Sequence, residues 1–120
     1  MNRVQKVVLK SCVVLVGAVL SVAAFAHHGW TGYEADAQKV SGVIDEASYS
    51  NPHASIRLKA AEKTWVVVLA PPSRMGNRGL TEEMLKVGKT VSVEGYAHKS
   101  NATEMRAERI SIDGKTIELR

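Results

Sequence analysis

The chain has 120 residues, which is the length of one small domain. Its 16 basic residues outnumber its 12 acidic residues, for a net charge of +4. Three basic residues and no acidic residue lie before position 27, so residues 27–120 carry 13 basic against 12 acidic residues, a net charge of +1. A charge this close to zero, in a chain with 5% aromatic residues, argues against a nucleic-acid-binding protein.

The first 26 residues have the pattern of a secretory signal peptide. Arg3, Lys6 and Lys10 precede an uninterrupted apolar run over residues 13–26, and Ala24 and Ala26 occupy the two positions of an A-x-A cleavage site. The run is shorter than the roughly 20 apolar residues of a membrane-spanning helix. We therefore expect a signal helix that is cleaved after Ala26, a protein located in the periplasm, and no stable membrane anchor after cleavage.

The only cysteine is Cys12, which precedes the apolar run. A cysteine that carries a lipid would follow the run, so we do not expect a lipoprotein. Cleavage removes Cys12, so the exported protein is expected to have neither a disulfide nor a thiolate metal ligand.

Residues 40–70 are expected to form three strands. Apolar and polar residues alternate over residues 54–60, which is the period of a half-buried strand. The β-branched run over residues 64–70 is typical of a strand covered on both faces, and residues 61–63 would form the hairpin between these two strands. Residues 40–49 predict an earlier strand, in which the adjacent Val43 and Ile44 break the alternation and indicate a bulge.

Short helical turns are expected to separate these strands from the last ones. Ser73 and Thr81 could each cap one turn, and Gly88 could end the second turn. Residues 91–97 and 105–112 predict further strands, and Asp113-Gly114 predicts a tight turn into residues 115–119. Three strands, a short helix and two or three strands are the order of a small OB-fold-like barrel. We therefore expect an all-β domain with one short helix, with an open sheet or a small β-sandwich as the alternative.

These elements predict three parts of the chain: the signal peptide (residues 1–26), an N-terminal segment that begins with two histidines (residues 27–38), and the barrel (residues 39–120). After cleavage, His27 would carry the free α-amino group of the chain. This amine and the His27 ring could chelate one metal ion together, at little cost in ordering entropy. Nitrogen ligands of this kind suit copper, zinc and nickel. Such an arrangement resembles the histidine brace of copper proteins.

The other candidate ligands are the remaining three histidines. His53 follows the Asn51-Pro52 turn, and His98 lies at the end of the strand over residues 91–97. The strand alternation predicts that both side chains point away from the apolar face. His28 is the third candidate and needs a turn, which Gly29 would permit. The predicted metal ligands are therefore His27, His28, His53 and His98, with copper preferred to zinc.

The residues that suggest relatives of this chain lie in four stretches: HHGWTGY, YSNPHA, APPSRMGNRGLTEEMLKVG and VSVEGYAHK. Together they resemble a family of short secreted bacterial proteins of unknown function, over essentially all of residues 27–120. The matching positions are His27, His28, Asn51, Pro52, His53, Arg78, Gly79, Thr81, Leu85 and Gly88. The chain departs from the family at Leu80 and Ala54, where members often have larger or aromatic residues. The resemblance implies export and a small β-rich domain, and it implies no activity.

Two functional hypotheses follow, and neither is enzymatic, because the sequence has no catalytic motif that we could identify. The first is copper handling through the processed N-terminus. The second is a binding or adaptor module for a peptide, a glycan or a periplasmic protein partner. Its barrel face would use Tyr49, Arg57, Lys59 and Tyr96. Met75, Met84 and Met105 are scattered in the sequence and are expected to fill the core.

Overall fold

The structure is a computed structural model and describes residues 30–120. Its elements are β1 (Gln38–Ser48), β2 (Ser55–Ala60), β3 (Thr64–Val68), α2 (Pro72–Asn77), the 3-10 helix η1 (Glu82–Leu85), β4 (Thr90–Ala97), β5 (Glu104–Ile112) and β6 (Lys115–Glu118). The expected signal segment, its cleavage site, His27 and His28 lie outside the described residues. Among residues 30–120, no helix is long and apolar enough to cross a membrane.

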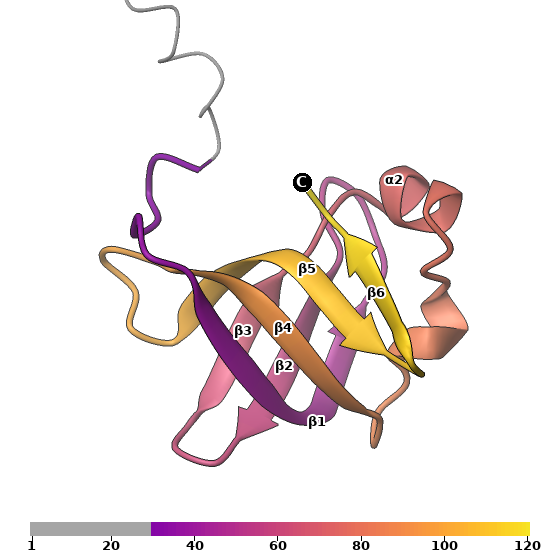
Figure 1. Cartoon of the computed structure of the whole chain (residues 1–120), viewed down its shortest axis with the longest axis horizontal. Helices are drawn as coiled ribbons and strands as arrows, with labels where there is room; N and C mark the ends of the chain where they lie inside the picture. Colours follow the sequence, from indigo (N-terminus) through magenta and orange to yellow (C-terminus); the bar gives the residue numbers. More distant parts are fainter. Residues whose placement is uncertain (1–29) are drawn as a thin grey trace, which may run out of the picture.

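Five strands close into a barrel (Figure 1). Strand β1 pairs with both β2 and β4, β2 pairs with β3, and β4 pairs with β5, all in antiparallel directions. A parallel pairing of β3 with β5 closes the ring, and β6 extends the sheet along the second half of β5. Because α2 and η1 lie between β3 and β4, the strand and helix order is that of an OB-like barrel, as predicted.

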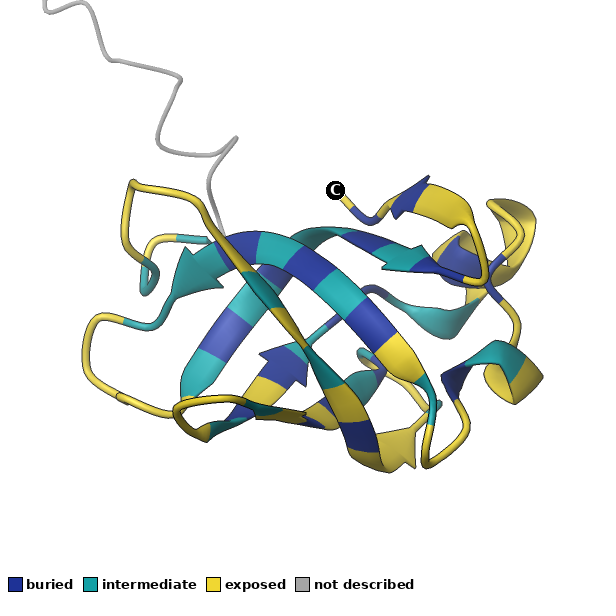
Figure 2. Ribbon diagram, turned by 60° about the horizontal axis from the view of Figure 1, so that its bottom comes forward, coloured by how far each residue is buried: buried dark blue, intermediate teal, exposed yellow. Residues whose placement is uncertain are grey.

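Buried residues alternate with less buried ones along β2, β4 and most of β5, as the colours in Figure 2 show. Ile56 and Leu58 of β2 face inward and are fully buried, and Val93 of β4 is buried in the same way. The core is completed by Met75 of α2, which is fully buried, and by residues of the following turn. The prediction that the methionines fill the core is confirmed for Met75 and Met105, which are 0% exposed, whereas Met84 is partly buried and packs against the core.

The predicted irregularity of the first strand is a β-bulge. The register of β1 against β2 shifts between Ile44 and Glu46, so Asp45 is the extra residue. The side chain of Ile44 is 1% exposed, whereas that of Val43 is 41% exposed. The adjacent pair therefore does not place two apolar side chains in the core; Ile44 is buried and Val43 faces solvent.

Strand β3 differs from its prediction. The apolar run was expected to be covered on both faces, but Val66 is 39% exposed. Trp65 and Val67 face the core, and Val66 points outward beside the parallel strand β5. A closed barrel has one inner face only, so a continuous apolar run leaves every second residue outside unless another element covers it.

The helix caps also differ from expectation. Ser73 was expected to cap the first turn, but it lies inside α2, which starts at Pro72 and has no side-chain cap at Pro71. Proline at the first helical position suits this start because its fixed φ matches the helix and it has no amide hydrogen to satisfy. Thr81 does precede η1, but its side chain makes no capping hydrogen bond. The tight turn at Asp113-Gly114 is confirmed, with φ values of 50° and 75°.

Candidate functional site

The described chain begins with a segment, residues 30–37, that lies against the end of β4. The backbone N–H of Glu34 donates to the carbonyl of Ala97 at 2.8 Å. Tyr33 and His98 form an isolated antiparallel bridge next to this bond. The segment is therefore fixed to the barrel before the chain enters β1.

Trp30 lies on the outer face of the barrel. Its indole contacts two tyrosine rings and two arginine guanidinium groups. Its ring packs edge-to-face on Tyr96, with 5.7 Å between centroids, and lies 6.3 Å from the ring of Tyr33. The guanidinium carbons of Arg106 and Arg120 lie 4.4 Å and 4.7 Å from the centroid of the same indole. Each cation–π contact of this kind stabilises by about 0.5–1 kcal/mol at an exposed site. These contacts fix the position of the Trp30 side chain on the barrel.

His98 holds the loop between β4 and β5. Its Nδ1 accepts hydrogen bonds from the backbone N–H groups of Ser100 and Asn101, both at 3.1 Å. In the neutral ring Nδ1 is therefore the acceptor, and Nε2, which lies 3.8 Å from a carboxylate oxygen of Glu104, carries the proton. The hydroxyl of Tyr33 donates to the same carboxylate at 2.7 Å, and burial together with Glu104 raises the pKa of Tyr33 to about 12. These contacts support a structural role for His98.

His53 has different surroundings. It follows the cis Asn51–Pro52 bond in the loop between β1 and β2 and is half-buried. Burial lowers the pKa of its imidazole, and the positive charges of Arg106 and Arg74 lower it further. The ring is therefore neutral at pH 7, which is the form that binds metal ions. The charge of Arg106 thus acts on His53, and the guanidinium of the same residue lies over the ring of Trp30.

The lowered pKa of His53 predicts an acid sensitivity of the fold. The unfolded chain binds the His53 proton near pH 6.5, whereas the folded chain binds it only at a lower pH. Between these two values the unfolded state holds more protons, so the free energy of unfolding must decrease as the pH falls below 6.5. We expect His53→Gln to reduce this decrease in urea titrations between pH 7.5 and 5. The same pH dependence in the variant would contradict this assignment.

The structure describes two of the four predicted metal ligands, His53 and His98. His27 and His28 lie outside the described residues, and their role stays a prediction. His53 and His98 both lie on the outer side of the barrel, in two different loops. Within residues 30–120, no three His, Cys, Asp or Glu side chains form a group that could hold a metal ion.

The residues predicted to form a ligand-binding face lie on different elements, except that Arg57 and Lys59 share the exposed side of β2. The Tyr49 hydroxyl lies 2.8 Å from the carbonyl oxygen of Leu80, to which it donates, and fixes the segment that follows α2. Tyr96 donates to Glu108 at 2.8 Å and is in contact with Trp30. Arg57 lies on β2, which is not a neighbour of the strand β4 that carries Tyr96.

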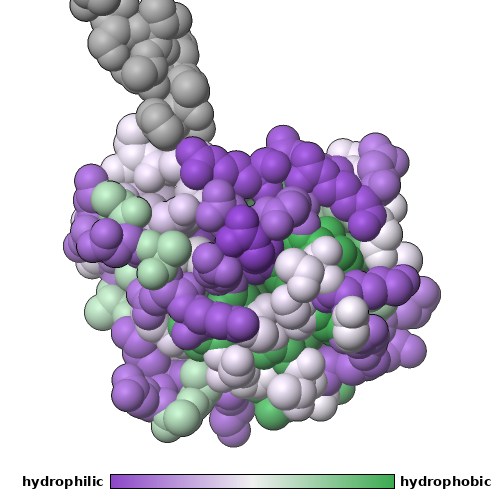
Figure 3. Space-filling model, viewed as in Figure 1, coloured by the Kyte–Doolittle hydropathy of each residue, from purple (hydrophilic) through white to green (hydrophobic). Residues whose placement is uncertain are grey.

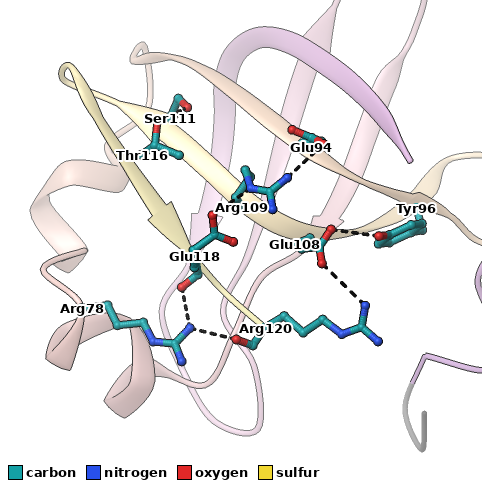
Figure 4. Close-up of polar contacts among 9 residues, drawn as sticks. All are labelled: Arg78, Glu94, Tyr96, Glu108, Arg109, Ser111, Thr116, Glu118 and Arg120. Atoms are coloured by element: carbon teal, nitrogen blue, oxygen red, sulfur yellow. Dashed lines mark hydrogen bonds and ion pairs between the residues drawn. The ribbon is translucent and has the colours of Figure 1, made fainter. Parts of the chain in front are cut away.

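Two arginines, one inside α2 and one at its end, have a role that the sequence did not reveal. Arg78 donates to the carbonyl oxygens of Glu118 at 2.7 Å and of Arg120 at 3.0 Å, as Figure 4 shows. Arg74 donates to the carbonyl oxygen of Leu119 at 3.1 Å. These hydrogen bonds connect residues 118–120 to α2. They place Arg120 so that its guanidinium lies over the ring of Trp30. Their i, i+4 spacing indicates a shared side of the helix, but the acceptors lie some 40 residues away.

The outer face of β4, β5 and β6 is polar over much of its area, as Figure 3 shows. Arg109 of β5 lies 2.9 Å from carboxylate oxygens of both Glu94 on β4 and Glu118 on β6 (Figure 4). These exposed ion pairs connect the three strands, and each contributes little to stability. The aromatic cluster around Trp30 lies beyond one end of this polar network, where Glu108 contacts Tyr96.

Comparison with known proteins gives a family match and weak likenesses to solved structures. A search among curated proteins finds no match to this chain. A solved crystal structure of a complex of TiaS with a transfer RNA and ATP is similar over 63% of this chain, with 18% sequence identity and a TM-score of 0.49. This chain spans only 18% of the length of that chain.

A family profile matches residues 15–106, which is most of the chain and includes both the first described residues and strands β1 to β4. The match agrees with the resemblance to a family of unknown function that the sequence suggested. It brings no activity with it. The chain belongs to a family of unknown function, DUF6152.

Proposed function

We propose that the exported form of this protein binds copper, with the α-amino group and ring of His27 and the ring of His53 as ligands. The observation that carries this proposal is the position of Arg106. Its guanidinium stacks on Trp30, at 4.4 Å from the ring centroid, and its charge also acts on His53. The fixed residue Trp30 and the neutral ring of His53 thus share one neighbour.

Chain length supports this choice of ligands. His27 lies three residue steps before Trp30 in the sequence, and an extended chain covers at most about 10 Å over three steps. Because Arg106 contacts Trp30 and its charge acts on His53, this short reach supports the choice of the N-terminal amine as a ligand together with His53. His28 is the better candidate for a further ligand, because Nδ1 of His98 already accepts two backbone hydrogen bonds.

The charges near His53 favour copper over zinc. Arg106 and Arg74 are positive, so they oppose a doubly charged ion about twice as strongly as a singly charged one. Copper can be bound as Cu(I), whereas zinc is always doubly charged. Nitrogen ligands also bind Cu(II) more tightly than Zn(II) by the Irving–Williams order. Copper handling or delivery in the periplasm, without catalysis, is the role that fits these properties.

The proposal is tested on protein that has been exported and purified from the periplasm. Intact mass measures the N-terminus, which we expect to be His27. A second protein carries one additional alanine before His27, and its N-terminus is confirmed in the same way. We expect the additional residue to weaken copper binding by more than tenfold, or about 1.4 kcal/mol, because the amine is moved away from the His27 ring.

Three results would contradict the proposal. One is a mature N-terminus at another residue, which would leave His27 without its amine. Another is equal affinity of the two proteins for copper, measured by competition with a chelator of known affinity. The third is tighter binding of zinc than of copper by the protein that begins at His27.

A further inference from the structure

A cavity of about 390 Å³ lies where the segment over residues 30–37 meets the end of β4. Three aromatic side chains line it, together with three polar ones: Trp30, Tyr33 and Tyr96, and Thr31, Glu34 and Lys99. This volume falls in the range of small-molecule sites, about 300–1,000 Å³. The lining does not include His53, so the cavity is separate from the copper ligand that we propose on the barrel.

The charged groups around this cavity cancel one another. Arg120 also lines the cavity, but its guanidinium is paired with the carboxylate of Glu108 at 3.6 Å (Figure 4). The hydroxyls of the two lining tyrosines donate to carboxylates as well. The positive groups are Arg106, Arg120 and Lys99, and the negative groups are Glu34, Glu104 and Glu108. Their charges sum to zero, so an ion of either sign has no electrostatic advantage here over an uncharged ligand.

Three polar side chains of the lining keep their capacity for hydrogen bonds. Among residues 30–120, the structure gives the side chains of Thr31, Glu34 and Lys99 no hydrogen-bond or ion-pair partner. A hydroxyl donates and accepts, a carboxylate accepts, and an ammonium group donates. A ligand with several hydroxyl groups can therefore bond to all three. Because all three residues are exposed, water weakens the attraction of Glu34 and Lys99 for an ionic or zwitterionic ligand.

The aromatic rings supply the apolar part of the cavity. The hydroxyls of Tyr33 and Tyr96 already donate to carboxylates, at 2.7 Å and 2.8 Å, so these residues present their rings to a ligand. The indole of Trp30 has two guanidinium groups over it and packs edge-to-face on Tyr96, which holds the Tyr96 ring in position. An apolar ligand surface therefore meets tyrosine rings that are already ordered, which lowers the entropic cost of binding.

We infer that this cavity binds the pyranose ring of an uncharged sugar. A pyranose with equatorial hydroxyls has C–H groups on its two faces and hydroxyls around its rim. The C–H groups of one face pack against the two tyrosine rings. The hydroxyls of the rim bond to the three polar side chains, which are Thr31, Glu34 and Lys99. Neither contact needs a net charge at the cavity, and the site does not depend on the proposed copper binding.

The test uses probes that separate the contributions of the ring, the hydroxyls and the charge. Methyl β-D-glucopyranoside has the ring and the hydroxyls without a charge, tetrahydropyran has the ring alone, and glycerol has hydroxyls alone. Glucuronate and glucosamine add a negative and a positive charge to the same sugar. NMR titration of the unmodified protein, with a chelator present to remove copper, gives the affinities. We expect the glucoside to bind with a Kd of about 1 mM, and about fivefold more tightly than tetrahydropyran or glycerol.

The charged sugars and a longer glycan extend this comparison. We expect glucuronate and glucosamine to bind no more tightly than the glucoside, because the charges at the cavity sum to zero. Cellotetraose distinguishes the two sources of such a ring. A Kd about tenfold lower than that of the glucoside assigns the site to an extended glycan, and a similar Kd assigns it to a single sugar unit.

The indole N–H signals locate the binding. The chain has two tryptophans, and Trp65 is a core residue that is 7% exposed. A Trp65→Phe variant assigns the remaining signal to Trp30. In the unmodified protein we expect the glucoside to shift the Trp30 signal and to leave the Trp65 signal in place. If the variant is poorly folded, saturation transfer from the aromatic protons of the unmodified protein to the glucoside reports the same contact with the rings.

Variants of the polar lining complete the test. We expect Glu34→Ala and Lys99→Ala each to weaken glucoside binding about fivefold, because each removes one hydrogen-bond partner of the sugar. Glu62→Ala and Lys115→Ala are the matched controls, because both residues are exposed and neither lines the cavity. The proposal is overturned by no saturable glucoside binding, by a charged sugar that binds more than about tenfold more tightly, or by unchanged affinity in both lining variants. Because copper is absent, these outcomes do not depend on the metal site.

Discussion

Replacing Gly95 with alanine is expected to lower the free energy of unfolding by about 3 kcal/mol. Gly95 lies in β4 at a shift of register against β5, opposite Ala107. A Cβ atom at this position would lie 2.1 Å from the carbonyl oxygen of Arg106 and 2.8 Å from the Cα of Ala107. Both are backbone atoms of a paired strand, so neither can rotate away. Strands β4 and β5 would have to separate at this position.

Gly76→Ala is the matched control for this substitution. Gly76 lies inside α2, and the nearest atom to an added Cβ would be the Tyr49 hydroxyl oxygen at 3.9 Å. Alanine is also the better helix former, by about 1 kcal/mol. We expect this variant to be as stable as the original protein or slightly more stable. Urea unfolding of both variants measures the difference, and a loss below about 1 kcal/mol in Gly95→Ala would contradict the close approach of β4 and β5.

The alternation of residue types predicted most strands because the barrel has a single inner face. Ile56 and Leu58 alternate with the exposed residues Arg57 and Lys59, and this pattern locates β2 without any knowledge of its partners. The break in alternation at Val43 and Ile44 indicated an irregularity in β1 but not its cause. Val43 faces solvent, and the extra residue of the bulge is Asp45.

Closure of the barrel could not be derived from such local patterns. The parallel pairing of β3 with β5 joins Val66 to Glu104, and nothing in either strand specifies this partner. The sequence predicted barrel closure only because the order of its elements matches that of known OB-fold barrels. The exposure of Val66 follows from this pairing, which is why the expectation of a strand covered on both faces was wrong.

The candidate site was predictable in its residue types but not in its arrangement. Strand parity placed His53 and His98 away from the apolar face, and neither belongs to the hydrophobic core. The two histidines differ in their surroundings, which strand parity cannot predict. Loop N–H groups donate to His98, whereas the charges of Arg106 and Arg74 act on His53. The position of Trp30 was missed, because Arg120 reaches it from the opposite end of the chain.

We expect His53→Gln to lower the affinity for copper and His98→Gln to lower the stability of the fold. Glutamine has no ring nitrogen to bind the metal. If His53 is a ligand, His53→Gln weakens copper binding by about 100-fold or more, which corresponds to about 2.7 kcal/mol. If His98 holds its loop, His98→Gln changes copper affinity less than twofold, but lowers the free energy of unfolding by about 1 kcal/mol because two loop N–H groups lose their acceptor.

Each variant is the control for the other, since both replace an outward-facing histidine in a loop of the same barrel. Copper affinity is measured by chelator competition and stability by urea unfolding, both at pH 7.5, where the His53 ring is neutral. A larger loss of copper affinity in His98→Gln would exchange the two roles and move the metal site to the loop between β4 and β5. Equal and small effects of both substitutions would leave no described histidine as a ligand, because His53 and His98 are the two histidines within residues 30–120.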